Sequence, residues 1–183
     1  FDYRFSDDVN AYVKAARGYR SGGFSVRSQQ QPFEPEILWS YEAGLKTQFW
    51  DRRARFNVAG FYAEYSDQQV NQPVANPTGA GFGQVVVNAG KTQYKGIEAD
   101  LFLEPIDGFT LTGSLGYVHR EFKEYPLTQP NGTVINIADQ VIAETNTPDL
   151  TISGAVQYRH YFDNDMFLLT RVGASYEGSH FFF

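Results

Sequence analysis

Apolar and polar residues alternate along much of this chain, most cleanly over residues 39–49. The odd positions are apolar or aromatic apart from one threonine, and the even positions are Ser40, Glu42, Gly44, Lys46 and Gln48. Successive side chains of a β-strand point to opposite faces, so the pattern predicts a strand with one apolar and one polar face. Ten steps of about 3.3 Å, tilted by about 40°, give roughly 25 Å of height, which matches the apolar band of an outer-membrane barrel.

The same alternation predicts further strands. It recurs over residues 9–15, 56–65, 97–103, 109–117, 150–159 and 166–176, which makes seven strands, and residues 2–5 are expected to end an eighth. Only in residues 56–65 does the pattern not show which side chains lie on the apolar face. We place Asn57, Ala59, Phe61, Ala63 and Tyr65 on the apolar face, because this turns Glu64 to the polar one.

The connections between these strands alternate between short and long. The short ones centre on residues 51–54, 105–108 and 162–165, and the long ones cover residues 21–35, 66–87 and 121–147. Outer-membrane barrels combine short periplasmic turns with long extracellular loops. A soluble antiparallel sheet with one wet face would alternate in the same way. Long loops at one end, and apolar faces that end in aromatic residues, favour an all-β, antiparallel transmembrane β-barrel.

Composition narrows the possible functions. The 183 residues fit one domain or part of one, and without an initiating methionine we expect them to begin inside a longer or processed product. No apolar run reaches the length of a membrane-spanning helix. The chain has no cysteine, which excludes disulfides and thiol catalysis. A net charge of −6 without a basic patch disfavours nucleic-acid binding.

Ligand binding in a large barrel is expected at the outer ends of the strands. The candidates there are arginine, tyrosine and glutamine residues, namely Arg17, Arg20, Tyr65, Gln69, Tyr94 and Arg120. Arginine offers a rigid fork of donors to an anionic solute, and tyrosine offers a flat amphipathic face. The alternative is that these residues are ordinary parts of a barrel wall, because arginine also suits anionic lipopolysaccharide and tyrosine suits the membrane interface.

Catalytic and metal-binding patterns are weak. Glu98 and Asp100 share a strand face about 6.6 Å apart, but no positioned base or nucleophile accompanies them. His119, His160 and His180 lie far apart in the sequence and lack ligand spacing. The sequence therefore predicts no enzyme, no metal and no cofactor.

Four segments together resemble the C-terminal part of the barrel of TonB-dependent outer-membrane receptors. They are residues 9–24, the PE…SYE.GLK segment at 35–47, the FY..YSDQQ segment at 61–69 and the NAGK…YKGIE segment at 88–98. The four segments stand in the family's order and cover nearly the whole chain.

The resemblance implies a bacterial outer-membrane location and a role in transport. Such receptors are 22-stranded barrels filled by an N-terminal plug, and they import siderophore-bound iron, cobalamin or oligosaccharides with energy from the TonB complex. Residues 1–183 would be about a third of such a barrel, with the plug and the TonB box outside this sequence. The expected partners are outer-membrane lipid and lipopolysaccharide, the TonB complex through the N-terminal part of the protein, and a small nutrient.

Two other functions remain open at this stage. About eight strands could close into a small, self-contained barrel with a structural or binding role. An outer-membrane hydrolase could use the rim carboxylates and His119. The terminal run at residues 181–183 is interpreted as a truncation that enters an outer loop, and the sequence does not name the solute.

Overall fold

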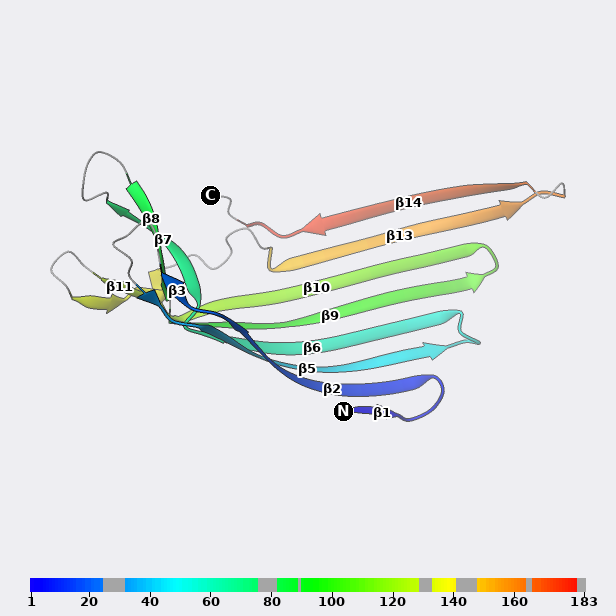
Figure 1. The fold of residues 1–183 in the computed structure, drawn as a ribbon. Coiled ribbons are helices and arrows are strands. Elements are labelled where there is room, and N and C mark those ends of the chain that lie inside the picture. Colours follow the sequence, from blue (N-terminus) through cyan, green and yellow to red (C-terminus); the bar gives the residue numbers. More distant parts are fainter. Residues whose placement is uncertain are drawn as a thin grey trace.

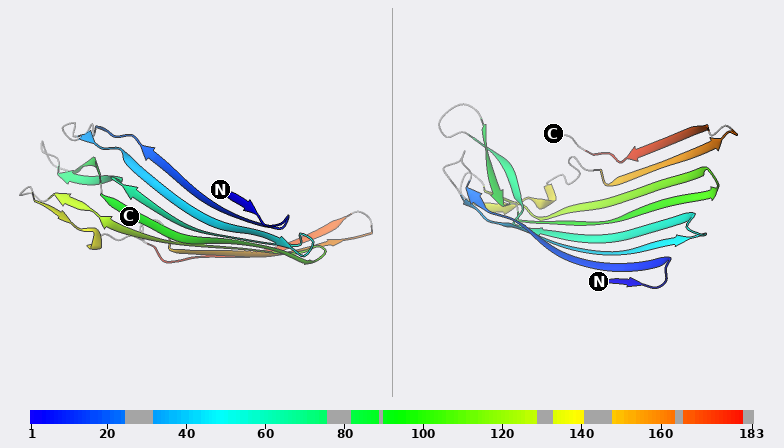
Figure 2. Two further views of the ribbon diagram at one scale, coloured as in Figure 1. Left: turned by 90° about the horizontal axis from the view of Figure 1, so that it is seen from below. Right: turned by 45° about the vertical axis from the view of Figure 1, so that its right-hand side comes forward.

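The protein forms one curved sheet of eight antiparallel strands (Figures 1 and 2). The computed structural model describes residues 1–24, 32–75, 82–88, 90–128, 133–140, 148–163 and 166–180. In spatial order the strands are β1 (Asp2–Arg4), β2 (Val9–Arg20), β5 (Glu36–Phe49), β6 (Ala54–Ser66), β9 (Lys91–Ile106), β10 (Phe109–Glu124), β13 (Leu150–Tyr161) and β14 (Phe167–Glu177). The predicted all-β, antiparallel fold is confirmed, and so are the seven strands and the eighth.

The eight strands do not close on themselves. β1 and β14 stand at opposite ends of the strand order, and each pairs with a single strand in the described part of the chain. The alternative of a small closed barrel is therefore wrong for this sheet. An open sheet edge is not tolerated in lipid, because its backbone groups have no partners there. The sheet consequently fits a section of a wider barrel wall.

The short turns between β1 and β2, between β5 and β6 and between β9 and β10 lie at one end of the sheet (Figure 1), and residues 164–165 of the short connection after β13 lie outside the described residues. The turn between β5 and β6 holds Trp50, Asp51 and Arg52 in the left-handed region, with φ of 61°, 51° and 67°. The turn between β9 and β10 has Gly108 at φ 76°, where a Cβ would lie 2.4 Å from the Arg159 carbonyl oxygen. Glycine is needed at that position because of both its φ and this close approach.

The long connections at the other end contain structure that the sequence analysis did not predict (Figure 1). They carry three small hairpins and a 3₁₀ turn, namely β3 (Gly23–Phe24) with β4 (Pro32–Phe33), β7 (Gln69–Ala75) with β8 (Phe82–Asn88), β11 (Pro126–Thr128) with β12 (Val134–Asn136), and η1 (Ala138–Gln140). Strands of two or three residues are too short for an alternation to be recognised, and β7 contains a proline, which argues against a strand. Among the described residues, no helix is long and apolar enough to cross a membrane.

The strand register fixes which residues share a face. We call the face that carries Leu45 the apolar face and the face that carries Lys46 the polar face. Directly opposite residues point to the same side, so Leu45, Val58 and Ala99 share the apolar face. The predicted facing of residues 39–49 agrees with the apolar sides of β2, β9 and β10 across these pairings.

The predicted facing of residues 56–65 is wrong. Asn57 pairs with Lys46, and Phe61 pairs with Glu42, so the odd residues of β6 lie on the polar face. Phe61 is on this side because its ring fills the space left by Gly96, which has no side chain. A Cβ added at Gly96 would lie 2.5 Å from the Phe61 ring. Glu64 pairs with Trp39 and lies on the apolar side, near the outer end of the strand.

The sheet is a single layer with almost no interior of its own. In the described chain, the buried residues are Ala54, Val85, Thr92 and Ala138. Large apolar side chains on the apolar face stay open, with Val172 70% exposed and Ile97 50% exposed. A soluble domain rarely exposes such a continuous apolar surface, because transfer of apolar area to water is costly. This surface suits the hydrocarbon of a bilayer.

Candidate ligand-binding rim

The polar face is connected by side-chain contacts across the strands. The Tyr12 hydroxyl donates to the Glu42 carboxylate at 2.6 Å, and Lys46 Nζ lies 5.3 Å from the Tyr12 ring centroid. The Tyr12 ring covers Gly44, where a Cβ would lie 2.5 Å away. Small and charged residues therefore interlock on this side, which is the wet side of a barrel wall.

A polar hollow of about 580 Å³ lies further along this face, toward the short turns. Its charged and polar lining consists of Arg55, Asn57, Asp100, Thr112, Ser114, Ser153 and Arg171. The hydroxyls of Ser114 and Ser153 are 2.7 Å apart, and the Arg55 guanidinium lies 4.7 Å from the Phe102 ring centroid.

At the outer ends of the strands, Arg20 and Gln69 are linked through Glu36. Arg20 is the last residue of β2 and pairs directly with Glu36, the first residue of β5. The Glu36 carboxylate accepts the backbone N–H of Gln69 at 2.8 Å. The Gln69 side-chain amide donates to the carbonyl oxygens of Ser21 at 2.9 Å and Glu34 at 3.2 Å. Gln69 therefore holds the rim backbone in place and has little donor capacity left for a ligand.

Tyr65, Tyr94 and Arg120 form a second group on the same face. The Tyr65 and Tyr94 rings meet edge to face with centroids 5.6 Å apart. Tyr94 pairs directly with Arg120 on β10, and the Arg120 guanidinium lies 5.3 Å from the Phe122 ring centroid. These side chains lie beyond Tyr62, at the outer end of the sheet.

Arg17 is separated from the other five candidates. It pairs with Trp39 on the apolar face, and its guanidinium lies 5.9 Å from the Trp39 ring centroid. Side chains on this face point away from the polar rim, so Arg17 cannot contribute to a site there. Arg20, Tyr65, Gln69, Tyr94 and Arg120 remain the rim candidates.

The sequence analysis missed Asn88, which connects three segments of the rim. The Asn88 side chain accepts the Glu34 N–H at 2.7 Å and donates to the Glu34 carbonyl at 3.0 Å and the Asp67 carbonyl at 2.7 Å. The sequence holds a signal for a turn, because Asn88 stands two residues before Gly90, and the structure places Gly90 at φ 63°. Glycine at positive φ marks a sharp change of direction, where amide side chains often replace backbone partners.

A hydrolytic site built from the rim carboxylates and His119 does not form. His119 pairs with Lys95 on the apolar face, whereas Glu98 pairs with Gly116 on the polar face. The sheet itself therefore separates the two groups. In the described ranges, no three histidine, aspartate or glutamate residues gather in a way that could hold a metal ion.

The comparison that identifies the chain is with a family model. The model described as TonB dependent receptor-like, beta-barrel matches residues 1–182. The chain belongs to the TonB-dependent receptor β-barrel family. The predicted resemblance and the bacterial outer-membrane location are thereby confirmed.

Solved structures of TonB-dependent receptors share this fold. The ferric yersiniabactin uptake receptor FyuA from Yersinia pestis is 20% identical, with a TM-score of 0.70, and the match covers 98% of this chain and 25% of FyuA. The ferric-catecholate import receptor Fiu from K12 E. coli is 19% identical, with a TM-score of 0.64, over 98% of this chain and 24% of Fiu. The pyoverdine outer membrane receptor FpvA from Pseudomonas aeruginosa PAO1 is 19% identical, with a TM-score of 0.65, over 97% of this chain and 24% of FpvA. The chain therefore spans about a quarter of the length of each of these receptors.

Proposed function

We propose that this chain is part of the barrel wall of a receptor that binds a scarce nutrient and imports it with energy from the TonB complex. Siderophore-bound iron is the nutrient class that we favour. The observation that carries this proposal is the rim group of Arg20, Tyr94 and Arg120, on the polar face at the end with the long connections. A solute that arrives from outside meets this part of a barrel wall first.

The chemistry of the rim suits an anionic ligand with flat groups. Arg20 and Arg120 present guanidinium forks that match carboxylate or phenolate oxygens, and the Tyr65–Tyr94 pair presents aromatic faces. Ferric complexes of small organic chelators combine both features. The solved structures that share the fold include receptors described for ferric yersiniabactin, ferric catecholate and pyoverdine, which supports the siderophore class.

The wall supplies binding and rigidity in this proposal. Asn88 and Gln69 hold the bases of neighbouring long connections together through backbone carbonyls, so the rim keeps its shape without a ligand. A rigid rim lowers the entropy cost of binding. The plug and the TonB box that import requires are proposed to lie outside this sequence, in the rest of the receptor.

Uptake in cells provides the test. Strains that lack the full-length receptor, or that carry it with or without TonB, are grown under iron limitation and supplied with ⁵⁵Fe bound to catecholate, hydroxamate or mixed-ligand siderophores. We expect accumulation of ⁵⁵Fe from at least one siderophore that requires both the receptor and TonB. Uptake of cobalamin or an oligosaccharide, without uptake of any ferric complex, would contradict the siderophore class. It would still support the proposal that the receptor imports a nutrient.

Rim variants test the site separately. Arg20→Ala and Arg120→Ala in the full-length receptor are each expected to weaken ligand binding by about tenfold, the loss that accompanies one charge-assisted hydrogen bond. Lys46→Ala, a cation further from the rim on the same face, is the matched control and should leave binding unchanged. Equal binding by all three variants would show that the ligand is held elsewhere in the receptor.

A further inference from the structure

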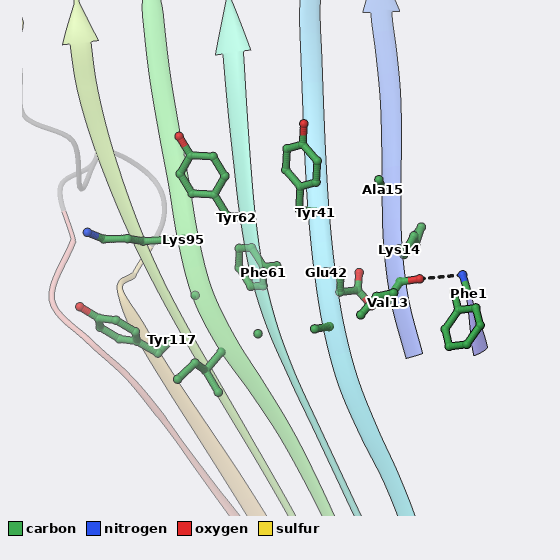
Figure 3. A pocket seen from close by; sticks show the side chains of 14 residues that line it. Phe1, Val13, Lys14, Ala15, Tyr41, Glu42, Phe61, Tyr62, Lys95 and Tyr117 are labelled. Atoms are coloured by element: carbon green, nitrogen blue, oxygen red, sulfur yellow. Dashed lines mark hydrogen bonds between the residues drawn. The ribbon is translucent and has the colours of Figure 1, made fainter. Parts of the chain in front are cut away.

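The sheet is hollowed on both faces. The larger hollow, of about 880 Å³, is lined by apolar-face side chains such as Tyr41, Tyr62 and Tyr117 (Figure 3). In a membrane that face meets lipid, so hydrocarbon fills this hollow. The smaller hollow, of about 580 Å³, lies on the polar face and is called the polar hollow from here on. Its volume is within the range of small-molecule sites, and its face is the wet side of a barrel wall.

Small side chains form the floor of the polar hollow. Thr112 of β10 pairs with Ala155 of β13, and Ala155 pairs with Gly173 of β14, so these three residues stand in one row across the sheet. All three line the hollow. Longer side chains at these positions would fill the space, so the hollow exists because the residues of this row are small.

An arginine stands at each side of this floor. Arg55 of β6 has its guanidinium 4.7 Å from the Phe102 ring centroid, and both residues line the polar hollow. Arg171 stands two residues before Gly173 on β14, so its side chain points to the same face. Because β6 and β14 are separated by four strand spacings in the sheet, the Cα atoms of the two arginines lie about 20 Å apart. This spacing favours a ligand with two separated anionic groups over a single carboxylate.

The charges around the polar hollow are not neutralised within the described chain. No ion pair among the described residues includes Arg55, Arg171 or Asp100, which are the charged residues of the lining. Two arginines and one aspartate give this part of the wall a formal charge of +1. Asp100 pairs with Ser114, whose hydroxyl is 2.7 Å from that of Ser153, so neutral polar groups accompany the aspartate. Guanidinium groups bind oxyanions through two parallel donors, which makes this lining suitable for an anionic ligand.

The polar hollow is separate from the rim. Arg120 of the rim and Thr112 of the hollow both belong to β10 and stand eight residues apart, which is about 26 Å along the strand. One small ligand therefore cannot contact both places at once. A solute that enters at the long connections and leaves at the short turns passes the rim first and the hollow later.

We propose that the polar hollow is a second binding site on the import path, which receives an anionic ferric complex after the complex has left the rim. Arg55 and Arg171 bind two separated carboxylate or phenolate groups of the complex. Asp100 and the Ser114–Ser153 pair form hydrogen bonds with the part of the ligand between them. The proposal rests on the importer function proposed above, and it adds where the wall holds the solute below the rim.

Transport kinetics of the full-length receptor in cells test this site. The probes are the ⁵⁵Fe complexes of catecholate and mixed-ligand siderophores, which are anionic. Arg55→Gln and Arg171→Gln are each expected to lower the maximal TonB-dependent uptake rate by about tenfold, the loss that accompanies one charge-assisted hydrogen bond. Binding at the cell surface without TonB should stay within about twofold of wild type, because the rim is unchanged. Heat-modifiable gel mobility reports correct folding of each variant.

Two further variants separate the site from a general effect of charge. Arg171→Lys keeps the cation and is expected to recover most of the uptake rate. Arg159→Gln removes an arginine from the same face, but that guanidinium already contacts the rings of Tyr161 and Phe167, with centroids at 6.0 and 5.3 Å. Its uptake rate should therefore match that of the wild type.

A chemical probe examines the polar hollow without relying on import. This chain has no cysteine, so Ser114→Cys gives it one thiol, in the lining of the hollow. The thiol is treated in the full-length receptor with an anionic sulfonatoethyl or a cationic trimethylammonioethyl methanethiosulfonate, and the receptor without the substitution is the blank. Relative to the same two reagents on a free thiol, the anionic one is expected to react about threefold faster, because the arginines attract it. Adding Arg171→Gln should remove this preference.

Four results would overturn the proposal. The first is an unchanged uptake rate in both Arg55→Gln and Arg171→Gln, or an equal loss in Arg159→Gln. The second is entry of large antibiotics into the Arg55→Gln and Arg171→Gln strains without TonB, which would show that these arginines hold the plug. The third is a Ser114→Cys thiol that reacts equally with both reagents or with neither. The fourth is import of uncharged ferric complexes alone.

Failure of the importer function gives a different result. In that case the wild-type receptor itself takes up no ferric complex, whereas failure of the second site leaves wild-type uptake intact and removes only the difference between the wild type and the arginine variants. The thiol reaction rates report the charge of the polar hollow in either case.

Discussion

The apolar and polar faces of the sheet are built from the same strands but are held by different forces. On the apolar face, side chains such as Leu45 and Leu101 remain 36% and 37% exposed, because their remaining contacts are with lipid. On the polar face, Tyr12 and Glu42 form a specific hydrogen bond of 2.6 Å, as do Ser114 and Ser153 at 2.7 Å. The stability of the apolar face therefore depends only on its residues being apolar. The stability of the polar face depends on which residues bind each other.

The largest effect is expected where a charge enters the apolar face. Leu45→Arg at mid-height should lower the free energy of unfolding of the full-length receptor by about 2–4 kcal/mol, because a guanidinium would face hydrocarbon. Lys46→Ala, one residue further on the polar face, should change it by no more than about 1 kcal/mol, since it loses only an exposed contact with the Tyr12 ring. Denaturant unfolding in micelles measures both values. Equal losses would contradict the facing of β5.

A smaller effect tests the corrected facing of β6. Val58→Asp should lower the unfolding free energy by about 1–2 kcal/mol, because carboxylates on the lipid face cost less than arginine. Asn57→Asp, on the polar face opposite Lys46, should be nearly neutral. The same unfolding measurement compares the pair. A larger loss at residue 57 than at residue 58 would restore the facing that the sequence alone suggested.

The smallest effect concerns a single partner on the polar face. Tyr12→Phe removes the hydroxyl that binds Glu42 and is expected to lower the unfolding free energy by about 1 kcal/mol. Tyr117→Phe makes the same chemical change on the apolar face, where the hydroxyl has no hydrogen-bond partner within the described residues, and should have no measurable effect. A matching loss in both variants would mean that the hydroxyls act through the membrane interface instead.

The two ends of the sheet differ in how far they could be predicted. The short turns are local, and residues such as Asp107–Gly108 identify them directly. The long connections contain the β3–β4, β7–β8 and β11–β12 hairpins, which no alternation revealed. The positions of these hairpins depend on contacts such as that of Asn88 with Glu34, which lies 54 residues away in the sequence. Contacts of that range leave no periodic trace in the chain.

Only part of the rim could be predicted, because it too depends on contacts between residues far apart in the sequence. Residue type and strand ends selected Arg20, Tyr65, Tyr94 and Arg120, which share one face. Arg17 was included wrongly with this group, because its position near a strand end says nothing about the direction of its side chain until the register with Trp39 is known. The facing of β6 was wrong because Phe61 is apolar yet covers Gly96 on the wet side.

The sequence by itself determined the strand periodicity, the alternation of short and long connections and the family. These features follow from local rules, since a strand turns each side chain through half a revolution and a membrane wall requires one apolar face. The tertiary structure alone decided the register, the facing of β6 and the linked bases of the long connections. Each of these depends on which residue lies opposite another across the sheet, and a one-residue shift in pairing would reverse it.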